Sequence, residues 1–494
     1  MIPTLFGLLT VLLGFWLLWR KDVLLLLAAM LALGLLEASA AIFLPSLGNS
    51  SIPPARVMLG FLLLASLWQL GTRASLLQEA LAANWALAVF CIYGLISALL
   101  LPKIFAGAIN VVPMRPVGLR SLFDTFPLSF SPQNVTTGVY LIGTGLAAIT
   151  AYIAGRLATD ITPLIKVGIA IALAQAITGI LGVVLVHTPW DAFVDFIRNG
   201  SYSQIQQADK SLIRVSGFMS EPSAYARVAI IWMVFCTELW LRDIRPRWSG
   251  AGALLLAGVL IASASSTAYV GLGIYAIVLA GRFMTFPTYA RSAKLLPLVL
   301  FGVIGVIGLL ALVVLSDTVA NEFAKTFQRM TVEKSGSESG QQRLFWAMQG
   351  IDAFKVSWGL GIGAGSFRSS SIAMAIVGSM GVIGICSFAL YCLGLFRFLP
   401  SPRAAVGDKL RLDVASVAAW SALGTLYPAI VIQNSPDPGM EFAAFAGLAL
   451  ALRLPALAPA ATKSNPTWGR SPISGERLRP PPTPQGVGWR RFAK

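Results

Sequence analysis

Apolar residues fill long blocks of this chain, and short polar connections separate one block from the next. A helix needs about 20 apolar residues to cross roughly 30 Å of hydrocarbon, and most of the blocks approach that length. Inside lipid every backbone N–H and C=O group must be paired within its own segment, so the blocks are predicted to be helices. We expect spans at residues 3–19, 24–45, 56–70, 84–101, 139–155, 164–186, 224–241, 250–265, 267–283, 295–315, 371–397, 413–432 and 439–454.

The same pattern limits the fold class. A transmembrane β-barrel would alternate apolar and polar residues over segments of about 10 residues, and this alternation is absent. The blocks 250–265 and 267–283 meet at SASSTAYVG, which predicts either two helices or one long element with a break. We therefore predict an all-α polytopic membrane protein with about 12–13 transmembrane helices.

Basic residues fall on every second short connection. Loops rich in Lys and Arg stay preferentially in the cytoplasm, so this side is predicted to be cytoplasmic, with the N-terminus outside and the C-terminus inside. The connections concerned carry Arg20, Lys21, Arg73, Arg156, Arg242, Arg245, Arg247, Arg282, Arg291, Lys294, Arg397, Arg403, Lys409 and Arg411.

Composition agrees with the membrane class. The chain is 56% hydrophobic and 12% charged with a mean hydropathy of +0.76, which excludes an ordinary soluble globular protein. Much of the formal net charge of +16 lies in short basic loops and in the C-terminal segment. No platform of aromatic and basic residues accompanies this charge, so nucleic acid is not an expected partner.

The two ends of the chain differ in character. The first block is followed by Arg20 and Lys21 instead of a small-residue cleavage site, which predicts a retained span. From about Pro455 the chain becomes rich in Pro, Arg and Gly and closes with LRPPPTPQGVGWRRFAK. Such a segment cannot bury a core, so residues 455–494 are predicted to be a disordered basic cytoplasmic tail, for solubility or for contact with anionic lipid. Residues 1–454 then form the transmembrane domain.

The cysteines give no sign of a disulfide framework or of a metal site. All four lie inside apolar blocks, where small buried hydrophobic side chains are the simplest interpretation. They are Cys91, Cys236, Cys386 and Cys392.

Three long connections, at 102–138, 187–223 and 316–370, fall on the predicted outer side and are rich in arginine. Long loops are exempt from the positive-inside bias, so the topology permits this charge without explaining it. Arginines beside the outer face of a membrane suit a phosphate-bearing lipid substrate, because guanidinium groups hold phosphate oxygens in bidentate fashion. The arginines include Arg115, Arg120, Arg198, Arg214, Arg329, Arg343 and Arg368.

Charged residues crowd the start of one apolar block, in the stretch RVSGFMSEPSAYARV at 214–228. Glu-Pro-Ser at 221–223 has a structural explanation, because an acidic residue, a proline and a serine all favour a helix N-terminus. That explanation does not account for Arg214 or Gly217. Charged groups beside hydrocarbon cost several kcal/mol unless they are paired or hydrated, so a functional interpretation stays open beside the structural one.

A second stretch, SGSESGQQRLFWAMQGIDAFKVSWGLGIGAGSF at 335–367, combines a predicted helix with a glycine-rich run. Apolar residues recur at helical spacing from Gln342 to Ala353. Arg343 lies at the start of this helix, where a cationic side chain and free backbone N–H groups can hold an anion. The glycines around Gly361 and Gly363 are predicted to let the backbone approach a substrate closely. An interfacial helix followed by an ordinary loop is the alternative.

The order of these motifs resembles the superfamily of bacterial O-antigen polymerases, exopolysaccharide polymerases and O-antigen ligases. An Arg-x-x-Gly-x-x-x-Glu-Pro pattern precedes a central span, and a long outer loop then carries Ser-Gly-x-x-Arg-x-x-Trp and Gly-x-Gly. The likeness covers roughly residues 210–390 and the overall topology. The matching residues are Arg214, Gly217, Glu221, Pro222, Ser339, Gly340, Arg343, Trp346, Gly361, Gly363, Gly381 and Gly384.

The resemblance implies a glycosyltransferase C-like membrane enzyme that needs no metal and no cofactor. Its substrates would be undecaprenyl-diphosphate-linked glycans, donor and acceptor, at the periplasmic face of the inner membrane, with a flippase and a chain-length regulator as further partners. Arg214 and Arg343 would hold the donor diphosphate, and Glu221 would either activate the acceptor hydroxyl or orient Arg214. With neighbouring residues of the same motifs and loops, the set expected to contact substrate is Gly217, Pro222, Ser223, Tyr225, Trp346, Gly361, Gly363, Arg120 and Arg368.

Two departures from the family pattern favour a polymerase over a ligase. Ligases of this group carry His-Asn where this chain has Ser370 and Ser371, and the single histidine, His187, lies elsewhere, at the end of a span. Glu221 replaces the asparagine of the ligase pattern. A ligase that transfers a finished glycan remains the first alternative function. A lipid-linked oligosaccharide flippase is the second, although such a transporter is expected to show related halves, and no internal repeat is evident.

Other polar residues admit two interpretations each. Glu37 lies within a predicted span, where an acidic residue suggests function, but it can equally hydrogen-bond a neighbouring helix. Ser265, Ser266 and Thr267 either line a cavity or allow close helix packing. Glu333 and Glu338 are candidate bases or solvated loop charges.

Overall fold

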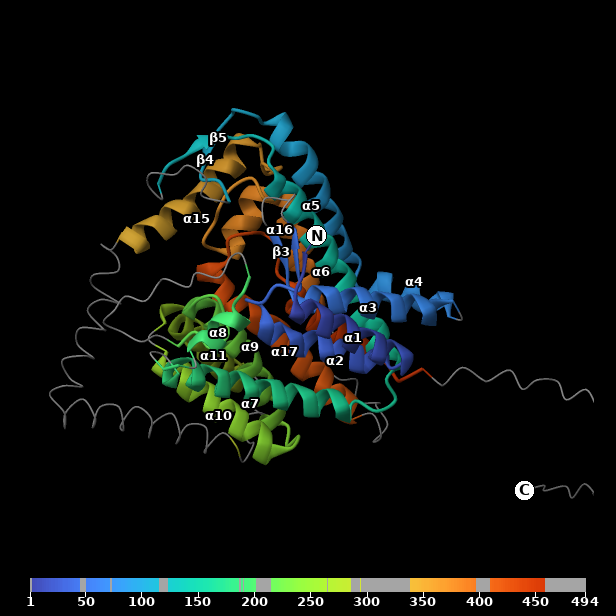
Figure 1. Ribbon diagram of the computed structural model, residues 1–494. Coiled ribbons are helices and arrows are strands. Elements are labelled where there is room, and N and C mark those ends of the chain that lie inside the picture. The colour runs from blue at the N-terminus through green and yellow to red at the C-terminus, as the bar shows by residue number, and fades with distance from the viewer. Residues whose placement is uncertain are drawn as a thin grey trace, which may run out of the picture. The chain divides into compact units, whose positions relative to one another are not determined.

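The structure is a computed structural model that is mostly helical (Figure 1). It describes residues 2–44, 50–71, 73–114, 123–185, 188–189, 191–200, 215–263, 265–285, 294, 338–396 and 409–457. The predicted span 295–315 and the tail from residue 458 onward lie outside these ranges.

Within the described ranges, seven helices are long and apolar enough to cross a membrane (Figure 1). Each coincides with one predicted span, so the prediction of a mostly helical, multi-pass membrane protein is confirmed at this level. The helices are α5 (Trp85–Ile104), α6 (Pro132–Leu157), α7 (Thr162–Val184), α9 (Pro222–Leu241), α11 (Ser266–Thr285), α16 (Ile372–Gly394) and α17 (Lys409–Ile432).

Shorter apolar helices account for the other predicted spans that the structure describes. They are α1 (Leu5–Trp19), α2 (Val23–Leu33) with the 3-10 turn η1 (Gly34–Leu36), α3 (Pro54–Leu70), α10 (Pro246–Ala262) and α18 (Met440–Leu452). The ambiguous pair at 250–283 is resolved as two helices, α10 and α11.

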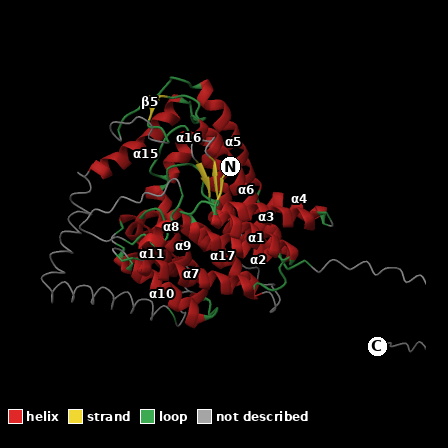
Figure 2. Cartoon of the chain, in the orientation of Figure 1, coloured by secondary structure: helices red, strands yellow, loops and turns green. Residues whose placement is uncertain are grey.

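Two details of the prediction are wrong. The span predicted at 24–45 ends as a helix at Leu36, and β2 (Ile42–Leu44) follows. This strand pairs antiparallel with β1 (Ile2–Pro3) and with β3 (Ser50–Ile52), so the fold is not purely helical (Figure 2). A strand of only three residues is too short to give a recognisable alternating pattern within a long apolar block.

Helices and strands also form in the predicted polar connections. The helix predicted at 342–353 extends further in both directions, as α15 (Glu338–Val356). The prediction did not include α4 (Ala74–Ala83), α8 (Asp191–Ile197) or the pair β4 (Asn110–Val111) and β5 (Phe126–Pro127). In Figure 1, α15 lies beside α16 and β4, and the first of these contacts is among the larger helix pairings of the fold.

Contacts between connections separate into two groups, as the predicted alternation requires. At one end, here the loop end, Ser39 donates to the Ile197 carbonyl (2.6 Å), the Arg368 N–H donates to Val112 (2.9 Å) and the Ser369 N–H donates to Asn434 (3.2 Å). At the other, the basic end, Arg411 donates to the carbonyls of Gly155, Ala158 and Leu454, and the Leu457 N–H donates to Arg156. Which end faces the cytoplasm stays a prediction.

The core is centred on α9, the most enclosed of the seven long helices, which packs against α7, α10, α11 and α17. Its aromatic residues pair with α18: the rings of Trp232 and Phe445 lie 5.5 Å apart, edge to face. Small residues let other helices approach closely. A Cβ at Gly447 would lie 2.1 Å from the Ala148 carbonyl oxygen, which explains the extensive contact between α18 and α6.

Candidate functional site

The helix-start interpretation of Glu-Pro-Ser is confirmed. Helix α9 begins at Pro222, whose missing N–H costs nothing in the first turn, and Glu221 is the N-cap in an extended conformation. The Ser223 hydroxyl donates to the Glu221 carboxylate, and the Tyr225 N–H donates to the Glu221 carbonyl (3.1 Å). Glu221 is therefore held at the loop end by its own helix.

Gly217 forms a tight turn immediately before this helix. Its φ of +53° favours glycine, and a Cβ at this position would lie 2.8 Å from the Tyr225 ring. The Arg198 guanidinium donates to the Ser216 hydroxyl (2.7 Å) and to the Gly217 carbonyl, which fixes the turn. These contacts are all with protein, and they give Gly217 a packing role.

Tyr225 likewise has a packing role. Its side chain is fully buried, and its hydroxyl donates to the Gln175 carbonyl at 2.8 Å. Contact of Gly217 or Tyr225 with substrate stays a prediction.

The glycine-rich run, predicted to approach a substrate, packs against helices α5, α6 and α16, and contact with a substrate stays a prediction. That helix is broken at Gly381, whose φ of +55° and ψ of −147° interrupt the helical ladder. The loop repairs the break: the N–H groups of Ile362 and Gly363 donate to Gly378 (2.8 Å) and Ser379 (3.0 Å). A Cβ at Gly361 would lie 2.4 Å from the Ser379 carbonyl, so the glycine is needed for the approach of two backbones. Paired backbone is a requirement at membrane depth.

This repaired loop carries Arg368 toward α15. The Arg368 guanidinium lies 4.4 Å from the ring centroid of Trp346, within cation–π range, and the Ser370 hydroxyl donates to the Arg343 carbonyl (2.6 Å). Arg343 and Trp346 are three residues apart on α15 and so share one face. Arg368 is thereby placed against the helix face that also carries Arg343.

Neither guanidinium has a hydrogen-bond acceptor or an ion-pair partner among the described residues. Both arginines are only half-buried, and the Nε of Arg368 is enclosed without a partner. Burial lowers the pKa of the Arg368 guanidinium, and the charge of Glu221 acts in the opposite direction, which places that carboxylate nearby. An arginine remains cationic under such conditions. Among the described residues, the arginines of this site have the nearby charge of Glu221 but no hydrogen-bonded or ion-paired acceptor.

A second unsatisfied group supports this interpretation. Gln342 is only 7% exposed, and its Nε2 is a buried donor without a partner among the described residues. Gln342 precedes Trp346 by four residues and Gln349 by seven, so the three lie on one face of α15, toward the loop that carries Arg368. Buried donors are nearly always paired in proteins, which points to a missing acceptor here.

Several predicted residues lie outside the described ranges: Arg214, Arg120, His187 and Glu333. The pairing of Arg214 with Arg343 therefore stays a prediction. The structure places Arg368 over Trp346, one turn from Arg343 on α15, whereas the sequence predicted Arg368 only as a substrate contact. Its signal was the general one, an arginine in a long loop beside the Gly-x-Gly motif.

Four further residues considered in the sequence analysis have contacts within the protein. Ser370, at the place of the ligase histidine, has its hydroxyl engaged by Arg343. Ser265 and Thr267 are buried at the start of α11, where small side chains allow close packing. Glu37 forms an ion pair with Arg227 of α9, a helix-to-helix contact of the kind considered above.

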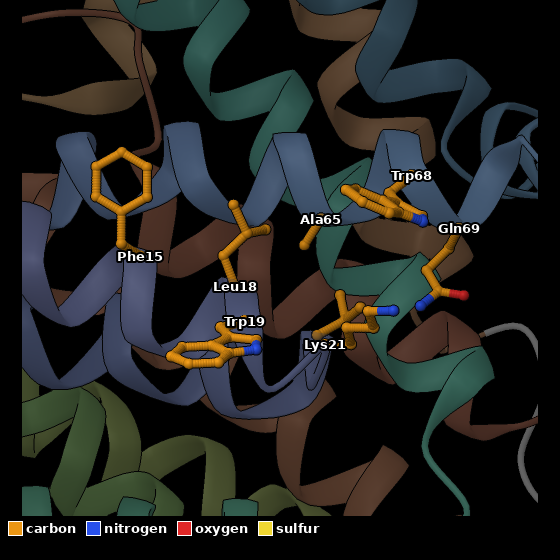
Figure 3. Close-up of a pocket in the computed structure, with 8 residues that line it drawn as sticks. Phe15, Leu18, Trp19, Lys21, Ala65, Trp68 and Gln69 are labelled. Atoms are coloured by element: carbon orange, nitrogen blue, oxygen red, sulfur yellow. The ribbon is translucent and has the colours of Figure 1, made fainter.

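The hollow shown in Figure 3 lies near the basic end and is apolar. Its volume is about 280 Å³, and its lining combines aromatic and aliphatic side chains of α1 and α3 with Lys21 and Gln69. Tryptophan and lysine beside an apolar surface are typical of helices that face lipid at a membrane interface. We do not assign the chemistry to this hollow.

Comparisons with protein-family models, with curated proteins and with solved structures find no match for this chain.

Proposed function

We propose that this chain is a bacterial inner-membrane glycosyltransferase of the C-like type, which joins lipid-diphosphate-linked oligosaccharide repeat units into a polysaccharide at the periplasmic face. The observation that carries the proposal is that Arg368 lies over Trp346 on the face of α15 that also carries Arg343, and that neither guanidinium has a hydrogen bond or ion pair among the described residues. A diphosphate offers the acceptors that they lack, and its lipid would lie beside the apolar helices.

The chemistry needs positioned charge more than a reactive group. The acceptor hydroxyl oxygen would bond to the anomeric carbon while the bond from that carbon to the phosphate oxygen breaks, and the lipid diphosphate would leave with the electron pair. Arg343 and Arg368 would neutralise the developing charge on the leaving group. The hydroxyl proton would pass to Glu221. The charge of Glu221 acts on Arg368, and the residue is held in place as the N-cap of α9.

The packing role of Ser370 supports a polymerase over a ligase, because its hydroxyl, at the position of the ligase histidine, is already a donor to Arg343. Purified protein in liposomes, supplied only with a lipid-linked repeat unit, should produce a ladder of products. Strict dependence on a different, added acceptor would contradict the polymerase and indicate a ligase. Movement of the lipid-linked unit across the bilayer without any new glycosidic bond would indicate a flippase.

A further inference from the structure

A second polar cluster lies at the loop end, apart from the arginines of α15 and its loop. It brings together five charged side chains from five segments: Glu37 after η1, Arg56 of α3, Arg227 of α9, Asp437 before α18 and Glu441 within it. Each interacts electrostatically with others of the set. Charged groups among membrane helices are costly and mark functional sites by default.

Two of the three carboxylates already have partners. Glu37 forms the ion pair with Arg227. Asp437 accepts from the Thr144 hydroxyl (2.7 Å) and from the Gly439 N–H (3.1 Å), and the charge of Arg56 is the strongest influence that opposes its burial.

The remaining two groups, Arg56 and Glu441, have no hydrogen bond or ion pair among the described residues. The Arg56 guanidinium lies 3.6 Å from the ring centroid of Tyr140 and so covers one face of this ring. The Tyr140 side chain is half-buried. The Glu441 carboxylate lies over two glycines, because a Cβ at Gly34 or at Gly439 would be 3.4 Å from one of its oxygens.

The cluster is also open. The side chains of Arg227 and Glu37 are 18% and 36% exposed, whereas Ala38, Ala226 and Phe442 beside them in sequence are fully buried. These two side chains are therefore accessible to solvent.

Two independent links place the cluster next to the arginine site. Glu221 and Arg227 lie six residues apart on α9, which is roughly 9 Å along a helix. The Ser369 N–H, adjacent to Arg368, donates to the carbonyl of Asn434, three residues before Asp437. A substrate whose diphosphate lay on Arg343 and Arg368 would therefore have the cluster within reach of a neighbouring sugar.

The balance of charges in the cluster indicates which class of ligand it could bind. Three carboxylates against two guanidiniums leave an excess of one negative charge, which disfavours phosphate. No three His, Cys, Asp or Glu side chains of the described residues are placed to hold a metal ion. A carboxylate without donors and an aromatic ring suit a neutral ligand with many hydroxyl groups.

We propose that this cluster is the subsite for the acceptor saccharide, in which Glu441 accepts hydrogen bonds from sugar hydroxyls and Tyr140, backed by Arg56, supports the sugar ring. The assignment rests on the proposed function and extends it by naming where the acceptor binds.

The test separates saccharide binding from diphosphate binding. The probes are inorganic diphosphate and the oligosaccharide released by mild acid from the lipid-linked repeat unit of host cells. Glu441→Gln and Tyr140→Ala should each weaken oligosaccharide binding about ten- to one-hundred-fold in calorimetry, because a charge-assisted hydrogen bond or a ring contact is lost. Both variants should bind diphosphate as the wild type does, and this binding serves as the test of correct folding. Asp352→Asn, which removes an exposed carboxylate on α15, is the matched control and should change neither affinity.

Wild-type affinity for the oligosaccharide in both folded variants would overturn the assignment and leave the cluster a helix-packing network. Wild-type protein that forms polymer but does not bind the free oligosaccharide would also overturn it. Wild-type protein that binds both probes and forms no polymer would instead contradict the proposed function while leaving the saccharide subsite supported.

Discussion

Arginines at the two ends of this bundle differ in their hydrogen bonds and ion pairs. At the basic end each buried arginine has partners: Arg156 pairs with Glu79 (2.9 Å), Arg242 pairs with Glu238 (2.6 Å), and Arg411 donates to three carbonyls. At the loop end Arg343, Arg368 and Arg56 have none among the described residues, although all are half-buried. Paired charges of this kind hold helices together, and under the proposed function the loop-end arginines would bind the substrate instead. The same residue type would then serve structure at one end and function at the other.

Two arginines at the loop end are exceptions to this contrast, because they are paired. Arg198 and Arg227 are at the loop end and both have partners, in the Gly217 turn and in Glu37. They position the elements on which the unpaired groups stand. Removing a paired arginine or its carboxylate should therefore cost stability, whereas removing an unpaired one should cost activity.

The largest effect is expected from Glu238→Ala at the basic end. Glu238 is fully buried between Arg242 and Arg282, so its loss leaves two enclosed guanidiniums without a counter-ion. We expect a loss of about 3–5 kcal/mol in the free energy of unfolding, measured by thermal denaturation in detergent. The folded fraction should keep the polymerisation rate per molecule of the wild type. A specific loss of rate in correctly folded protein would break the assignment of the basic end to structure.

Arg343→Ala and Arg368→Ala should produce the reverse outcome. Each removes a group expected to stabilise the departing diphosphate, so the polymerisation rate should fall about 10²–10³-fold. Because neither guanidinium has a hydrogen bond or ion pair among the described residues, the melting temperature should stay within a degree or two of the wild type. The measurement is the rate of ladder formation in liposomes together with thermal denaturation of the same preparations. Normal polymer length and amount in cells that carry both substitutions, Arg343→Ala and Arg368→Ala, would contradict the proposed diphosphate site.

Sequence reasoning reached the apolar helices because length and hydrophobicity are local properties of each block. The sequence placed the start of α9 to within two residues, because Glu221 and Pro222 are typical of a helix N-terminus. It failed over 24–45, where η1 ends at Leu36 and a short strand follows. Apolar composition alone does not distinguish a helix from a strand of three residues.

The site was harder to predict because its contacts join distant parts of the chain. Glu37 and Arg227 are 190 positions apart, and nothing in either local sequence names the other. Arg343 and Trp346 were found from a motif, whereas the approach of Arg368 depends on how the loop repairs the break at Gly381. The glycines were recognised, but the sequence did not show that Gly361 and Gly363 also approach the backbones of α16 and α5.

The third prediction concerns that repaired break. Gly361→Ala adds a Cβ 2.4 Å from the Ser379 carbonyl at a φ of +86°, so the loop must move away from α16. We expect a loss of about 1–3 kcal/mol in the free energy of unfolding and a fall in polymerisation rate, because Arg368 moves with the loop. Gly60→Ala on α3 is the control, since its Cβ would meet nothing within 4 Å. Equal behaviour of the two variants would show that the glycine loop does not position the site.

The smallest effect should come from the aromatic rings under the arginines. Arg368 lies over Trp346 at 4.4 Å and Arg282 lies over Trp420 at 3.8 Å, but only Arg282 also has a carboxylate partner. An exposed cation–π contact contributes about 0.5–1 kcal/mol, so Trp346→Leu should weaken the binding of inorganic diphosphate by roughly two- to fivefold. Trp346→Phe, which keeps a ring, should lose less. Trp420→Leu should leave diphosphate binding unchanged and lower the melting temperature, because its arginine is held by Glu238 for structure. If Trp420→Leu weakened diphosphate binding as much as Trp346→Leu does, the two ends would not be divided between structure and function.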